Sequence, residues 1–263
     1  MTWYLLSVAG AFGLVIGSFV NVVVWRVPRG ESVVRPPSAC PVCHASIRAW
    51  DNVPVVSWVL LRGRCRDCGT RISRRYPLVE ATTGVLFVLV AIRFLDAGDL
   101  AWAAPAYLYL AAVAVALALI DIDTHRLPNA IVLPSIPVML LLLGAASAVT
   151  GDWSRLGTSV LGGVVLFALY AAMVVAYPRG MGLGDVKLAA VIGVALGWLG
   201  WGPLAVGAFA AFLLGGGFSV TLLALRRANR KTALPFGPWM LAGAGVGIAA
   251  GAPLWSAYLG LFA

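Results

Sequence analysis

Charged residues are scarce in this 263-residue chain: 11% of the residues are Asp, Glu, Lys or Arg, and only 10 are acidic. An ordinary soluble domain carries about 25% charged residues. With 61% hydrophobic residues and a mean hydropathy of +0.95, so few charges cannot cover a surface that faces water. The composition therefore excludes a soluble globular enzyme and a disordered chain, and four cysteines do not make a disulfide-rich secreted module.

The chain contains long apolar segments, and they indicate an all-α polytopic membrane protein. A membrane-spanning helix needs about 20 residues, whereas the strands of an outer-membrane barrel are shorter and alternate in polarity. We predict about eight transmembrane helices, at residues 3–25, 78–95, 100–120, 131–149, 156–177, 186–200, 203–225 and 236–259. The first segment has no Lys or Arg before it, so we expect a retained span rather than a cleaved signal peptide.

One segment, residues 26–77, has no apolar run long enough to span a bilayer. It holds 10 of the 19 basic residues and three acidic ones, which gives it a net charge of +7. The positive-inside rule then places it in the cytoplasm and the N-terminus outside, and it explains the net charge of +9 without a nucleic-acid partner. We therefore divide the chain into a first transmembrane helix (1–25), a cytoplasmic insert (26–77) and a seven-helix membrane core (78–263).

All four cysteines lie in this insert, in two Cys-x-x-Cys pairs separated by 21 residues: Cys40, Cys43, Cys65 and Cys68. Each pair suits two corners of a tetrahedron, so the two pairs predict a four-thiolate zinc site. The cytoplasm is reducing, which argues against disulfides and leaves a redox dithiol or unligated thiols as the alternatives. Because four thiolates leave no open coordination position, the zinc would be structural and would hold a polar segment folded.

Three acidic residues, Asp121, Asp123 and Asp185, lie at predicted helix ends on the cytoplasmic side. Two carboxyl groups that meet share a proton, so one can activate water while the other polarises a carbonyl, which is aspartic peptidase chemistry. Asp121 and Asp123 point about 200° apart on a helix and cannot both face Asp185. Asp123 is expected to be a simple helix-end charge. Gly182 and Gly184 precede Asp185 and allow close backbone approach.

These features together resemble one known family, the type IV prepilin leader peptidase/N-methyltransferases, over nearly the whole chain. Beside the cysteine pairs, the motifs that carry the resemblance are Gly17-Ser-Phe-x-Asn21, Arg26-x-Pro28-Arg29-Gly30-Glu31, Asp51-Asn-x-Pro54, Asp121-Ile-Asp123 with Leu127-Pro128-Asn129, and Gly182-x-Gly184-Asp185-x-Lys187.

The resemblance implies an eight-helix membrane aspartic peptidase with Asp121 and Asp185 as its catalytic pair. Asp121 is chosen over Asp123 because the family's active aspartate also precedes the Pro of this motif by seven residues. Such enzymes cleave the basic leader of prepilins and pseudopilins at the cytoplasmic face of the inner membrane. Many then N-methylate the new first residue with S-adenosylmethionine, and an intact four-cysteine insert is usual in these bifunctional members. No S-adenosylmethionine motif can be recognised from the residues themselves.

Several alternatives remain beside this interpretation. The chain could be a peptidase without methyl transfer, or a small proton- or cation-coupled transporter, although a transporter would place its acids near the bilayer midplane. A catalytic zinc enzyme lacks an open metal position here. Gly13 and Gly17 could receive the apolar helix of a substrate or pack within the bundle. Lys187 could act on Asp185 or on a substrate carbonyl, or extend as an interfacial lysine.

Overall fold

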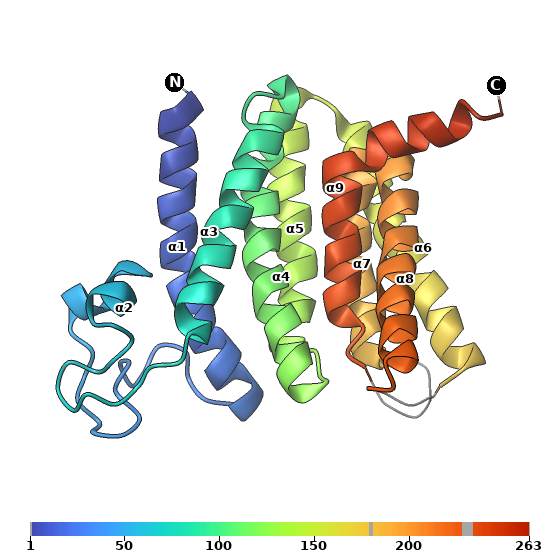
Figure 1. Cartoon of the computed structure of the whole chain (residues 1–263). Helices are drawn as coiled ribbons and strands as arrows, with labels where there is room; N and C mark the ends of the chain where they lie inside the picture. The colour runs from blue at the N-terminus through green and yellow to red at the C-terminus, as the bar shows by residue number, and fades with distance from the viewer. Residues whose placement is uncertain (1, 179–180, 228–233, 263) are drawn as a thin grey trace. The chain divides into compact units, whose positions relative to one another are not determined.

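The computed structural model describes residues 2–178, 181–227 and 234–262, and it confirms the all-α prediction. Within these residues there is no strand, only two isolated β-bridges in the cysteine-containing insert. The long helices, drawn in Figure 1, are α1 (Thr2–Arg26), α3 (Arg75–Phe94), α4 (Ala104–Thr124), α5 (Asn129–Thr150), α6 (Trp153–Ala176), α7 (Leu183–Leu199), α8 (Trp201–Ala224) and α9 (Gly237–Leu259). Each corresponds to one of the eight predicted segments.

Seven of these helices, all except α7, are long and apolar enough to cross a membrane. The chain is thus a multi-pass membrane protein, as predicted. Helix α7 has only 17 residues, and 12 of them are buried. A helix that is apolar on all sides belongs in the interior of a protein. We conclude that α7 is the central helix of the part of the chain that contains it.

The chain forms two compact units. The first comprises residues 1–104 and 111–116, with α1, the insert and α3. The insert has no long helix; it contains α2 (Val56–Leu60) and short 3-10 turns at Val27–Arg29 and Ala49–Asn52. Helices α1 and α3 lie side by side (Figure 1). A Cβ added at Gly13 would lie 2.8 Å from Gly84 and Phe87, and one at Gly17 would lie 2.6 Å from Glu80. Both glycines therefore serve packing within this unit.

The second unit comprises residues 105–110 and 117–263. In it α6 packs along α7, and α8 packs along α9. Glycines bring α6 and α7 together, because a Cβ added at Gly162 would lie 2.6 Å from the carbonyl oxygen of Gly193. Two carbonyl groups of α7 also accept hydrogen bonds from other helices: Ala195 from the Tyr107 hydroxyl at 2.8 Å, and Val194 from Ser159 at 2.7 Å. These contacts fix α7 among its neighbours.

The prediction of two helices within residues 186–225 is confirmed. Helix α7 ends at Leu199 and α8 begins at Trp201, and the single residue between them, Gly200, has a φ of 118°. L-residues rarely adopt this backbone conformation, whereas glycine does so without strain. Gly200 therefore separates the two helices sharply.

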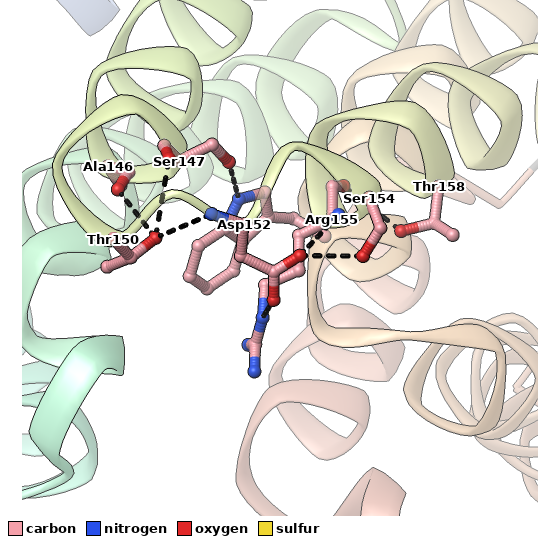
Figure 2. A network of polar contacts seen from close by, with 8 residues as sticks. Ala146, Ser147, Thr150, Asp152, Ser154, Arg155 and Thr158 are labelled. Atoms are coloured by element: carbon pink, nitrogen blue, oxygen red, sulfur yellow. Dashed lines mark hydrogen bonds and ion pairs between the residues drawn. The ribbon is translucent and has the colours of Figure 1, made fainter.

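A polar network closes the turn between α5 and α6 (Figure 2). Asp152 caps α6: its carboxylate accepts hydrogen bonds from the backbone N–H of Arg155 at 3.3 Å, from Ser154 Oγ at 2.6 Å and from Arg155 Nε at 2.7 Å. Ser154 and Arg155 thereby lower the pKa of Asp152. The Arg155 guanidinium also lies over the Trp198 ring, whose Nε1 donates to Ser147 at 3.1 Å. The network joins α5, α6 and α7 at the helix ends opposite those that carry Asp121 and Asp185.

Candidate active site

Asp121 lies in the last turn of α4, and it is only 5% exposed. Its Oδ2 accepts a hydrogen bond of 3.0 Å from the backbone N–H of Gly237, the first residue of α9. A helix N-terminus favours negative charge because its first N–H groups have no partner within the helix. A Cβ added at Gly237 would lie 2.7 Å from Asp121 Oδ2, so a larger residue would displace this carboxyl group or the start of α9. Glycine thus allows α9 to support Asp121 without displacing it.

Asp185 occupies the first turn of α7, and its support is also a glycine N–H group. Its Oδ2 accepts a hydrogen bond of 3.1 Å from the backbone N–H of Gly182, the residue that caps this helix. The next glycine of the motif, Gly184, packs on Leu127, since a Cβ added at Gly184 would lie 3.0 Å from the Leu127 Cβ. The Gly-x-Gly-Asp motif therefore combines a helix cap with a close contact to the segment that follows α4.

The structure brings Asp121 and Asp185 near each other, close enough for an electrostatic interaction between their carboxyl groups. Leu127 lies against Gly184 and also against Gly237, because a Cβ added at Gly237 would be 3.5 Å from Leu127 Cδ2. When two carboxyl groups interact and one of them is buried, ionising one disfavours ionising the other. The geometry therefore suits a pair that shares one proton.

Asp123, the other candidate on α4, is exposed, whereas Asp121 is buried. The predicted opposition of the two side chains is thus confirmed. The ammonium group of Lys187 donates to Asn129 Oδ1 at 2.9 Å and so joins α7 to the start of α5, a partner that the sequence did not indicate. Sequence reasoning had assigned no role to Asn129 or to Gly237. Asn129 ends the Leu-Pro-Asn motif, but no local pattern distinguished Gly237 from the other glycines.

The four cysteines form a cluster in the insert. Their Sγ atoms all lie within 4.8 Å of one another, and those of Cys40 and Cys68 are 3.8 Å apart. Four sulfurs at about 2.3 Å from a zinc ion would be separated by roughly 3.8 Å. Backbone N–H groups of Cys43 and Val42 lower the pKa of the Cys40 thiol to about 6, whereas burial and the neighbouring thiols raise the pKa of the Cys68 thiol. The donor set and its spacing therefore fit a structural zinc ion.

The two cysteine pairs lie in equivalent turns. In each, the first cysteine is followed after four positions by a residue with positive φ, His44 at 58° and Gly69 at 71°, whose N–H bonds back to that cysteine's carbonyl. Each turn is flanked by one isolated β-bridge. Of these two residues, only Gly69 is of a type that indicates a tight turn with positive φ in the sequence. In the first turn a histidine occupies this position, and a non-glycine residue adopts a positive φ at a higher conformational cost than glycine does.

Family models and curated relatives identify the family. Residues 11–94 match the model described as the bacterial Peptidase A24 N-terminal domain, and residues 108–220 match the type IV leader peptidase family. The prepilin leader peptidase/N-methyltransferase of Aeromonas hydrophila is 35% identical over 91% of this chain and 89% of its own length. Those of Neisseria gonorrhoeae and Pseudomonas putida are each 37% identical, over 81% and 90% of this chain and 80% and 88% of their own lengths.

The chain belongs to the type IV leader peptidase family. The resemblance recognised in the motifs is thus confirmed. The N-terminal match contains all four cysteines, and the second match contains Asp121 and Asp185. No solved structure matches the chain.

Proposed function

We propose that this chain is a prepilin leader peptidase, and that Asp121 and Asp185 are its catalytic pair. One observation carries the assignment: each carboxyl group is held by the backbone N–H of a glycine at a helix N-terminus, and Leu127 lies against glycines of both supporting segments. Membership in the type IV leader peptidase family supports the reaction class. The substrates are type IV prepilins, as the family and the names of the relatives indicate, or the similar pseudopilins.

The chemistry follows from a shared proton. The ionised carboxylate removes a proton from a water molecule while the water oxygen bonds to the carbonyl carbon of the scissile peptide. The protonated carboxyl group donates to the carbonyl oxygen, on which negative charge develops. When this tetrahedral intermediate collapses, the C–N bond breaks and a proton passes to the leaving amine. The pair returns to its starting state with one proton.

The location of the pair suits a prepilin. We place the protein in the inner membrane with the insert, residues 26–77, and both aspartates on the cytoplasmic side, because basic residues concentrate there. A prepilin has a basic leader followed by an apolar helix, so its scissile bond lies at the membrane surface. The seven helices within residues 78–263 would then form the peptidase core, and the lipid bilayer would surround both enzyme and substrate.

The insert would bind a metal ion, and the names of the relatives indicate a second activity, N-methylation. Cys40, Cys43, Cys65 and Cys68 would hold a zinc ion that keeps this polar segment folded and takes no part in hydrolysis. The relatives' names support N-methylation of the new first residue, for which S-adenosylmethionine is the methyl donor. We assign no residue to the donor.

The test uses the protein reconstituted in a bilayer with a prepilin and S-adenosylmethionine, and the mass of the intact product is measured. We expect the parent to remove the leader, Asp121→Asn and Asp185→Asn to be inactive, and Asp123→Asn to retain activity, since this side chain is exposed. An added methyl mass would establish the second activity, and an unmethylated product would leave a peptidase alone. Equal cleavage by the parent and both Asn variants would contradict the aspartic mechanism.

A further inference from the structure

A tyrosine that the proposed mechanism does not use lies beside the carboxylate pair. Tyr170, on α6, is 2% exposed and interacts electrostatically with Asp185. Its ring packs against Phe212 and Phe236, with centroid distances of 5.6 and 6.5 Å. Phe236 immediately precedes Gly237, whose N–H group supports Asp121. The same packing thus holds Tyr170 next to the segment that supports Asp121.

The hydroxyl group of Tyr170 makes no hydrogen bond to any residue in the described part of the chain. A fully buried hydroxyl group without a hydrogen-bond partner would destabilise the fold, because the free energy lost on removing it from water is not compensated. Across the described residues, however, no fully buried side-chain oxygen lacks a partner. The Tyr170 oxygen must therefore reach accessible space. A donor placed in this way is available to a molecule that enters the site.

A cavity of about 420 Å³ provides the adjacent space. Met173, one helical turn from Tyr170, lines it together with Phe212 and Phe236. Met181 also lines the cavity. It immediately precedes Gly182, whose N–H group supports Asp185. No charged side chain of the described residues lines this cavity. Its lining includes the sequence neighbours of both carboxylate supports, and it suits an apolar stretch of polypeptide, such as the membrane segment that follows a leader.

We propose that Tyr170 is a further catalytic residue, whose hydroxyl group donates a hydrogen bond to the carbonyl oxygen of the scissile peptide. This inference rests on the proposed peptidase function. The carbonyl oxygen gains negative charge as water adds, so a donor held in place beforehand stabilises the intermediate more than the bound substrate. Tyr170 keeps its proton throughout. The proton exchanges remain those of Asp121 and Asp185, and the electrons that move to the carbonyl oxygen return when the C–N bond breaks.

The test compares two variants that each remove one hydroxyl from a buried tyrosine. Tyr170→Phe keeps the ring that packs on Phe212 and Phe236. Tyr107→Phe is the matched control, because Tyr107 is 1% exposed but its hydroxyl has a structural partner, the carbonyl oxygen of Ala195. The full-length protein is reconstituted in a bilayer. The kcat and KM for prepilin cleavage are measured together with the Tm.

For Tyr170→Phe we expect kcat to fall about 100-fold, KM to stay within about threefold and the Tm to match the parent, as for loss of one oxyanion donor. For Tyr107→Phe we expect a lower Tm with kcat nearly unchanged. The inference is overturned if Tyr170→Phe keeps its kcat, or if its kcat falls only together with its Tm. If the parent does not cleave a prepilin at all, the proposed function itself fails.

Discussion

Gly237 offers the sharpest single-residue test of the carboxylate site. In Gly237→Ala the new Cβ would lie 2.7 Å from Asp121 Oδ2, whereas ordinary contact begins at 3.4 Å. The carboxyl group or the start of α9 must therefore move by about 0.7 Å, which lengthens the 3.0 Å hydrogen bond that holds Asp121. Because a displacement of about 1 Å at a reacting group can cost roughly 100-fold in rate, we expect kcat to fall about 30- to 100-fold.

The assay is prepilin cleavage by the reconstituted protein, with the Tm measured in parallel. The matched control is Gly245→Ala on the same helix, where an added Cβ meets no atom within 4 Å. Alanine is favoured over glycine inside a helix by up to about 1 kcal/mol, so the control should be as stable as the parent and fully active. If Gly237→Ala cleaves within threefold of Gly245→Ala, Asp121 does not depend on this contact and the reasoning fails.

Three further predictions follow from the metal cluster and the helix-end network. Elemental analysis of the purified parent should show one zinc ion per chain. The Cys43→Ser variant should lack this zinc, and equal metal content in both proteins would rule out the cysteine site. Trp198→Phe removes the indole donor of a buried hydrogen bond and should lower stability by about 1 kcal/mol, seen as a lower Tm, whereas the exposed Trp201→Phe should not. Because Asp152 has a lowered pKa in the folded protein, its stabilising effect should be complete above the ordinary pKa of about 3.9 and disappear as the pH falls through the lowered value. The Tm advantage of the parent over Asp152→Asn should therefore shrink on acidification, and an advantage independent of pH would contradict the assigned charge interaction.

Properties that depend on local composition followed from the sequence. Runs of apolar residues located all eight long helices, because a helix in a bilayer must satisfy its own backbone hydrogen bonds and expose apolar side chains. Cysteine spacing predicted the four-sulfur cluster, since each pair folds as a local turn. The helical period separated Asp121 from Asp123 on opposite sides of α4, but it could not decide which of them faces Asp185.

Contacts between distant segments appeared only in the tertiary structure. The support of Asp121 by Gly237 joins residues 116 positions apart, and Lys187 reaches Asn129 across 58 positions. Helix α7 is apolar like its neighbours, so hydropathy alone did not show that it lies in the interior of its unit. Which glycine contacts a carboxyl group, and which tyrosine has a hydroxyl without a partner, depends on how whole helices pack. Local sequence patterns do not encode that packing, because it depends on the shape of every surface in contact.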